Sequence, residues 1–291
     1  APDNTPGNKT LFTKSVARTL LAKIYAEKPL RDYTKVIQYC DEVKADGFDL
    51  VDDFSDLFGM NAAGTDAKMR NTKESILEAQ FTPGAGNWCT WMFGRDLVNW
   101  NNNFTWAKWV TPSRDLISTF KQEGDEVRFK ESVVYYDCGW SNYYPSDNYP
   151  FMYKCRSANS SIIKYRYADV LLLKAEALIM QDTPDLEGAA DIIDEVRDRA
   201  KLGALSSSTR SNKDALLNAL LKERRLELAF EGQRWFDLVR LDKVEEVMNA
   251  VHAKDSGRKA QVYTYDKNSY RLPIPQSVID ANDKIHQNPG Y

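Results

Sequence analysis

Apolar positions spaced three to four residues apart predict a helical hairpin near the start of the chain. The run TKSVARTLLAKIYAE has Thr13 as its expected N-cap, and Pro29 follows the end of the helix. Its expected apolar stripe consists of Val16, Ala17, Leu20, Leu21, Ile24 and Tyr25. The next run, RDYTKVIQYCDEVKADG, repeats the spacing and stops at Gly47. A tight turn that contains Pro29 joins the two predicted helices.

A second hairpin with the same pattern is predicted over residues 164–202. The stretch KYRYADVLLLKAEALIMQ is expected to be helical from its start. Its expected buried face carries Tyr167, Leu171, Ala175 and Leu178 beside Lys174. After a break that Asp185 caps, LEGAADIIDEVRDRA forms the returning helix. Both hairpins are typical of tetratricopeptide-like units, and because a stacked solenoid needs about three such units, we expect packing on further repeats or on other helices.

The last part of the chain is predicted to be helical over residues 212–240, with a kink or break near Gly232 and continuation through Val244. Two prolines in the sequence LPIP then predict an extended segment. Gln276 and Ser277 are expected to cap a short helix that ends near Asn282.

Residues 81–163, between the hairpins, lack helical periodicity except for a helix expected from Ser113 to Phe120. Six of the seven tryptophans fall here: Trp88, Trp91, Trp100, Trp106, Trp109 and Trp140. The same zone holds a tyrosine cluster: Tyr135, Tyr136, Tyr143, Tyr144, Tyr149 and Tyr153. We interpret this zone as a long excursion with short strands, and the fold as mostly α with an irregular aromatic-rich insertion.

Composition excludes several classes of protein. A net charge of −3 and a pI near 5.6 argue against nucleic acid as a partner. No apolar run approaches the length of a membrane span. Four scattered cysteines and two histidines give no zinc spacing, so we expect buried free thiols, with one disulfide as the alternative. The sequence contains no catalytic constellation, and we expect no cofactor and no metal.

The excursion has the residue types that bind sugars. A pyranose ring stacks its C–H face on indole or phenol rings, and its hydroxyls bond to amides and guanidinium groups. Asn99, Asn101, Asn102, Asn103 and Arg95 supply such groups among the tryptophans. The alternatives are that the aromatic residues form a small core, or that they contact another protein, since Trp, Tyr and Arg dominate protein interfaces.

A charged series near the C-terminus first suggests acid–base chemistry, but its spacing indicates a structural role. Glu223, Glu227 and Glu231 repeat at intervals of four, with arginines interleaved. This pattern is typical of an ion-pair lattice between helices. A glycosidase would instead require two carboxylates about 5–10 Å apart across a cleft.

Four motifs resemble the RagB/SusD family. The block ERRLELAFEGQRWFDLVRL resembles the signature near the C-terminus of that family. The ending LPIPQSVIDANDKIHQNPGY resembles the family's ending, and KYRYADVLLLKAEAL resembles a third family element. The opening TKSVARTLLAKIYAE is similar to a tetratricopeptide helix that the family places earlier. All four stand in the family's order.

The resemblance implies a non-catalytic lipoprotein at the surface of the outer membrane of a Bacteroidetes-type bacterium. It implies binding of oligosaccharides or other nutrients, and a TonB-dependent, SusC-like transporter as partner. A lipidated cysteine and further tetratricopeptide helices are expected upstream of residue 1, since Cys40 lies in no lipobox. The alternative is a protein-interaction module whose helices dock a transporter without binding glycan.

The resemblance also implies a division of the chain and a location for the site. Residues 1–291 form one SusD-like domain, with tetratricopeptide-like helices over 10–80, the ligand-binding excursion over 81–163 and the signature region over 164–291. Position in the chain favours as glycan ligands Trp88, Trp91, Arg95, Trp100, Asn101, Trp106 and Tyr143. The motif residues are expected to be architectural: Glu223, Arg224, Glu227, Arg234, Trp235 and Asp237.

Overall fold

The computed structural model describes residues 1–82, 86–87, 97–98, 111–138, 144–254 and 264–291, and it is mostly helical as predicted. Contacts divide the chain into two compact units, Ala1–Gln233 and Arg234–Tyr291. No helix among the described residues is long and apolar enough to cross a membrane.

The first predicted hairpin is confirmed as α1 (Lys14–Ala26) and α2 (Tyr33–Ala45), joined by a short 3-10 turn. The Thr13 hydroxyl accepts from the Val16 N–H, and Asp32 caps the second helix in the same way. Gly47, which follows α2, has a φ of +90°, a conformation that favours glycine over any side chain.

The predicted apolar stripe of α1 was wrong in part. The face that packs inward consists of Ser15, Val16, Thr19, Ala22 and Ala26. Leu20 and Ile24 are instead exposed, at 45% and 36%. Small residues let α1 approach its neighbours closely, and this close packing rotates the larger side chains outward.

The second hairpin is confirmed as α6 (Tyr167–Met180) and α7 (Leu186–Arg199), and Asp185 caps α7 through the Gly188 N–H. The predicted start at residue 164 was wrong, because Ile162–Arg166 form strand β4, which pairs with β1 (Ser75–Ala79). Helix α6 is buried on nearly every side, so its apolar surface extends well beyond the predicted stripe. It is the central helix of the scaffold.

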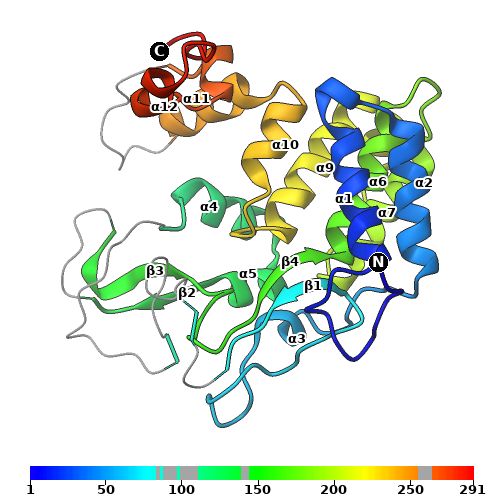
Figure 1. The fold of residues 1–291 in the computed structure, drawn as a ribbon. Coiled ribbons are helices and arrows are strands. Elements are labelled where there is room, and N and C mark those ends of the chain that lie inside the picture. Colours follow the sequence, from blue (N-terminus) through cyan, green and yellow to red (C-terminus); the bar gives the residue numbers. More distant parts are fainter. Residues whose placement is uncertain (83–85, 88–96, 99–110, 139–143, 255–263) are drawn as a thin grey trace. The chain divides into compact units, whose positions relative to one another are not determined.

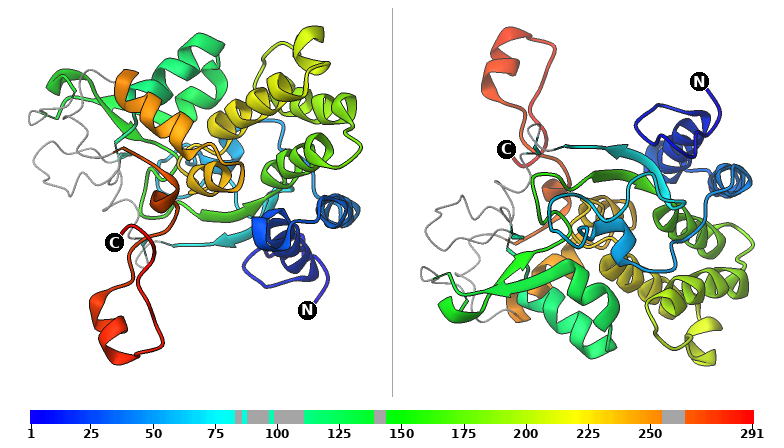
Figure 2. Two further views of the ribbon diagram at one scale, coloured as in Figure 1. Left: turned by 90° about the horizontal axis from the view of Figure 1, so that it is seen from above. Right: turned by 90° about the horizontal axis from the view of Figure 1, so that it is seen from below.

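The two hairpins pack on each other and on α9 (Lys213–Glu227), which Asn212 caps (Figure 1). Figure 2 shows the same helices lying next to one another when viewed nearly along their axes. One continuous core runs between them, with Val36, Leu172, Ile193 and Leu216 fully buried. The expectation that the hairpins need other helices is therefore confirmed by α9.

The excursion contributes two helices and two short strands to the described structure. Helix α4 (Arg114–Glu123) confirms the helix expected from Ser113, which is its N-cap; Gly124 is its C-cap, and α5 (Glu126–Ser132) follows. Strands β2 (Val133–Tyr136) and β3 (Tyr149–Met152) pair antiparallel in a sheet separate from that of β1 and β4. The short helix α3 (Ser55–Phe58) and α8 (Ser207–Arg210) complete this unit.

The predicted break near Gly232 is confirmed, since α9 ends at Glu227 and both Phe230 and Gly232 have positive φ. The second unit contains α10 (Arg234–Arg240), α11 (Val244–Lys254), a 3-10 turn η4 (Lys267–Tyr270) and α12 (Gln276–Ala281). Helix α12 ends at Ala281 with Asn282 as its C-cap, which confirms the predicted end near Asn282. The predicted cap was wrong, because the N-cap is Pro275 and the Gln276 amide bonds to Asp280 within the helix.

Candidate functional site

The residues predicted to bind glycan all lie outside the described residues. These are Trp88, Trp91, Arg95, Trp100, Asn101, Trp106 and Tyr143. Their roles stay predictions. The structure does describe parts of the excursion that flank them in the chain, namely residues 86–87, 97–98, 111–138 and 144–163.

Tyrosines of the excursion anchor these flanks. The Tyr136 hydroxyl donates to the Leu97 carbonyl at 2.6 Å, and the Tyr144 hydroxyl donates to the Pro112 carbonyl at 2.7 Å. The Tyr149 hydroxyl lies 2.8 Å from that of Thr111. Burial of the Tyr149 phenol raises its pKa, so it stays protonated at neutral pH.

These tyrosines also form a small core with Leu97, Cys138 and Phe151. The rings of Tyr149 and Phe151 lie 5.1 Å apart between centroids. For the described tyrosines, the interpretation as a local core is therefore confirmed. This core packs on the β2–β3 sheet, since Val134, Tyr136, Tyr149 and Phe151 belong to its two strands.

A polar cleft of about 430 Å³ lies beside this core. Its walls come from the loop after α3, from the excursion, and from the segment between β3 and β4. The side chains that line it with polar groups are Ser55, Asn61, Lys68, Glu131, Tyr136, Tyr153 and Arg156. Leu97 and Val98, which stand in the chain between Trp91 and Trp100, also line it. The cleft is therefore lined by residues that lie within two positions in the chain of predicted glycan ligands, Arg95 and Trp100.

Ion pairs fix the polar groups of the cleft in place. The Arg156 guanidinium donates to the Glu131 carboxylate at 2.8 Å and lies 3.7 Å from the centroid of the Tyr153 ring. On the opposite wall, Lys68 pairs with Asp56 at 2.7 Å and with Asp53 at 3.0 Å. Hydrogen bonds from Ser55 and then from Lys68 lower the pKa of Asp53 to about 2, so it is charged at neutral pH.

A glycine allows the loop after α3 to reach the excursion. Gly64 has a φ of +66°, and a Cβ at this position would lie 2.7 Å from the Val98 side chain. Asn61 closes the loop by accepting from the Thr65 N–H at 2.9 Å. This wall was not predicted, because it stands some distance before the aromatic zone. The feature of the sequence that could have indicated this loop is the run Asn-Ala-Ala-Gly at residues 61–64, since Asn and Gly are typical of turns.

A buried ion-pair network lies between the excursion and the helices, centred on Glu227. One carboxylate oxygen of Glu227 accepts from Arg166 at 2.5 Å and from Arg199, and the other accepts from Arg128 at 3.1 Å. All four side chains are at least 95% buried. Burial opposes ionisation of Glu227, but the three arginines outweigh it and hold its pKa well below the usual range.

Further acids extend the network to other segments. Glu74 accepts from Arg166 and Arg199, both at 2.7 Å, while Glu223 accepts from Arg128 at 2.5 Å. The network therefore joins α5, β4, α7 and α9 with the residue that precedes β1. The predicted architectural role of Glu223, Arg224 and Glu227 is confirmed by their burial and their ion pairs.

Lys154, just after β3, connects the excursion to this network. Its ammonium donates to the Glu227 carbonyl at 2.8 Å and to the Glu231 carboxylate at 2.6 Å. Burial lowers the pKa of Lys154 from 10.5 to about 8, although Glu231 opposes this shift. In the unfolded chain the amine regains its ordinary pKa. Below about pH 8 the amine is charged in both states, and burying the charge lowers the free energy of unfolding.

This cost of burying the charge predicts a pH dependence that Lys154→Met should remove. As pH rises from about 8 to about 10.5, the wild type should gain about 3 kcal/mol of unfolding free energy relative to the variant. Urea unfolding of both proteins at several pH values in this range measures the difference. Other groups that titrate here are common to both proteins and cancel. A constant difference would show that Lys154 keeps an ordinary pKa when folded.

The described residues offer little for metal or thiol chemistry. They contain no group of three or more His, Cys, Asp or Glu side chains placed to hold a metal ion. Cys40 and Cys138 are buried free thiols, as predicted, and the buried Cys155 thiol donates to the Asn87 side chain at 3.5 Å. Burial raises the pKa of Cys40 well above its usual range, so its thiolate is not populated at neutral pH.

The described structure is a helical scaffold of the SusD-like kind. It consists of two packed hairpins, the excursion between them, and α9, the signature helix, which carries the buried charges of the C-terminal motif. The chain belongs to the SusD family, whose family model matches residues 144–291. The SusD-like protein P38 of Formosa agariphila is 41% identical over 139 residues, which cover 46% of this chain and 25% of that protein. The match thus spans about a quarter of this curated relative.

Solved structures show the same fold over nearly the whole chain. A SusD-like protein from Bacteroides fragilis has a TM-score of 0.73 at 20% identity, covering 99% of this chain and 67% of that one. Surface glycan-binding protein A from Bacteroides thetaiotaomicron, in complex with laminarihexaose, also has a TM-score of 0.73, at 21% identity, covering 98% of this chain and 66% of that one. The family resemblance is confirmed by the family model, whose matched residues contain three of the four motifs.

Proposed function

We propose that this protein binds oligosaccharides at the bacterial cell surface without turning them over, and passes them to a TonB-dependent outer-membrane transporter. The observation that carries the proposal is the cluster of six tryptophans between residues 88 and 140 of a SusD-family chain. Described residues that neighbour them in the chain, such as Leu97, are held by hydrogen bonds beside a polar cleft. Family membership supports surface exposure through a lipid anchor and a SusC-like partner. The laminarihexaose complex of a protein with this fold supports a glycan as ligand.

The chemistry of the flanking cleft agrees with this proposal. Sugar hydroxyls bond well to guanidinium, amide and carboxylate groups that are already held in place. Arg156 and Glu131 are fixed by their ion pair, and Asn61 is fixed by its loop. The tryptophans supply the stacking surface, and the cleft supplies directional bonds. Capture then proceeds on a largely preformed surface.

Glycan titrations of the wild type and of Trp88→Ala and Trp100→Ala test the proposal. Because each stacked ring contributes about 0.5–1.5 kcal/mol, each substitution should raise the Kd for a bound oligosaccharide by about twofold to twelvefold. Tryptophan fluorescence and native gels containing polysaccharide give the affinities. Phe12→Ala is the matched control, since Phe12 is an aromatic side chain with 74% exposure in the N-terminal segment.

Two outcomes would contradict the proposal. One is that no glycan changes the fluorescence or the migration, and that Trp88→Ala or Trp100→Ala unfolds the protein; the rings would then be core residues and the chain a transporter-docking module. The other is that new reducing ends accumulate when glycan is incubated with the protein, which would indicate hydrolysis.

A further inference from the structure

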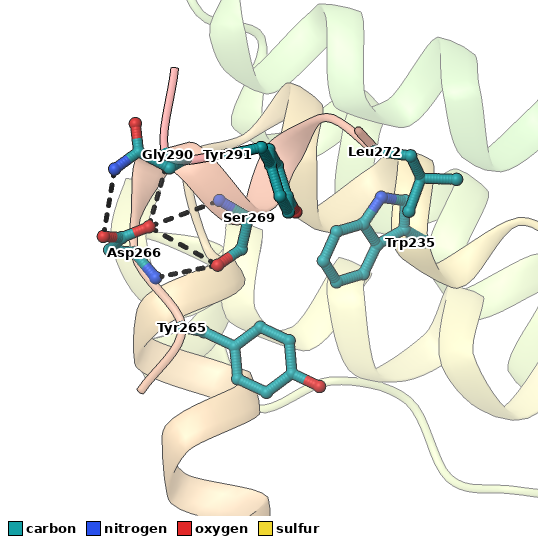
Figure 3. Close-up of a pocket in the computed structure, with 8 residues that line it drawn as sticks. Trp235, Tyr265, Asp266, Ser269, Leu272, Gly290 and Tyr291 are labelled. Carbon is teal, nitrogen blue, oxygen red and sulfur yellow. Dashed lines mark hydrogen bonds between the residues drawn. The ribbon is translucent and has the colours of Figure 1, made fainter. Parts of the chain in front are cut away.

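The C-terminal unit holds a pocket of about 720 Å³ that its own residues form (Figure 3). Three aromatic rings line it from three separate stretches of the chain: Trp235 on α10, Tyr265 before η4, and Tyr291 at the C-terminus. The rings of Trp235 and Tyr265 lie 6.3 Å apart between centroids and are tilted by 57°. Figure 3 shows the Tyr291 ring near Trp235 and above Tyr265 in this view, and all three rings line the pocket.

Close packing holds the third ring in place. The Tyr291 hydroxyl donates to the Arg271 carbonyl at 3.2 Å. Gly290 has a φ of +96°, and a Cβ there would lie 2.7 Å from the Cβ of Asn268. The Gly-Tyr end of the chain is therefore seated against η4 in a way that other residues at 290 would disturb. Tyr291 nevertheless remains 58% exposed, so the wall of the pocket is accessible.

One edge of the pocket is polar. Asp266 caps η4 by accepting from the Asn268 N–H at 2.8 Å and from the Ser269 N–H at 3.3 Å. This turn places an amide, a hydroxyl and a carboxylate beside the aromatic walls. No lysine or arginine lines the pocket among the described residues. The Asp266 carboxylate on this edge repels an anionic ligand, whereas a neutral ligand with hydroxyls would find stacking faces and hydrogen-bonding partners.

We propose that this pocket is a second carbohydrate subsite, which accepts a pyranose unit of a neutral glycan between the Trp235 and Tyr291 rings. Its volume falls within the ordinary range of ligand pockets, about 300–1,000 Å³. The choice of a sugar as ligand rests on the proposed function. Two sites on one chain would allow a long glycan to bind by avidity.

Fluorine NMR of protein labelled with 5-fluorotryptophan tests this subsite separately from the excursion. The sequence has seven tryptophans, six in the excursion and one in the pocket. The resonance that disappears in Trp235→Phe is that of Trp235. Titration with laminarihexaose, maltohexaose and cellohexaose should shift this resonance saturably for at least one of them. Tyr291→Ala should raise the Kd obtained from this titration by about tenfold.

Phe236→Ala is the matched control, because Phe236 is the next residue on α10, is 59% exposed and does not line the pocket. It should leave the titration of the Trp235 resonance unchanged. The subsite is overturned if the Trp235 resonance stays constant while excursion resonances shift, or if Phe236→Ala weakens binding as much as Tyr291→Ala. If the Trp235 resonance shifts while the excursion resonances stay constant, the proposed function is contradicted and the subsite is supported.

Discussion

Replacing Glu227 with glutamine is expected to lower the free energy of unfolding by about 3–5 kcal/mol. Both carboxylate oxygens of Glu227 accept from buried arginines. Glutamine keeps one oxygen, but its amide nitrogen would face a guanidinium donor at the other position. The buried arginine charges would also lose their shared counter-charge. Urea unfolding followed by far-UV circular dichroism measures this loss.

The control for this substitution is Glu187→Gln. Glu187 also pairs with an arginine, Arg210, but its side chain is 71% exposed. Exposed pairs contribute at most about 1 kcal/mol, so this variant should unfold nearly as the wild type does. If the two variants lose equal stability, the buried network contributes no more than a surface pair, and the anchoring of the excursion through it is wrong.

The network also shows what the sequence could predict. Glutamates at intervals of four with interleaved arginines predicted an ion-pair lattice. The like-charge contacts within that helix are relieved because Arg128, from a distant segment, contacts both Glu223 and Glu227. Local spacing predicts that such charges need partners. It cannot identify partners that lie about a hundred residues away, because the fold brings them together.

Two helix predictions failed for related reasons. Residues 164–166 join a strand because β1 offers a partner more than 80 residues earlier, and helical periodicity does not record such pairing. On α1, counting large apolar residues placed Leu20 and Ile24 inside, whereas the inward face carries Ser15 and Ala22. Tight helix packing selects for small side chains, and a hydrophobicity pattern alone undervalues them.

The sequence indicated which residue types the candidate site contains, but it did not indicate all the segments that form it. Clustered tryptophans and asparagines indicated the excursion, while the Asn61 loop and Arg156, which form the described cleft, carried no aromatic signal. Such walls are assembled from segments far apart in the chain. The aromatic pocket of the C-terminal unit likewise depends on three stretches whose rings meet only after folding.

Asp169→Asn is expected to cost about 3–5 kcal/mol of unfolding free energy at neutral pH. Asp169 on α6 pairs with Arg224 of α9 at 2.8 Å and with Lys23 of α1 at 2.6 Å. It thereby joins both hairpins to the signature helix. The variant removes the carboxylate that the buried Arg224 guanidinium contacts on α6. Asp41→Asn is the control, because Asp41 also pairs with a lysine but its side chain is 51% exposed.

The same substitution should change the response to acid. Burial opposes ionisation of Asp169, but Lys23 and Arg224 outweigh it and hold its pKa well below the usual range. Its stabilising contribution is therefore complete above the ordinary carboxyl pKa, about 3.9, and is lost as pH falls below it. The difference in unfolding free energy between wild type and Asp169→Asn should shrink between about pH 5 and about pH 2. A difference that stays constant over this range would mean that Asp169 titrates normally, and that the contact between the hairpins and the signature helix rests on packing alone.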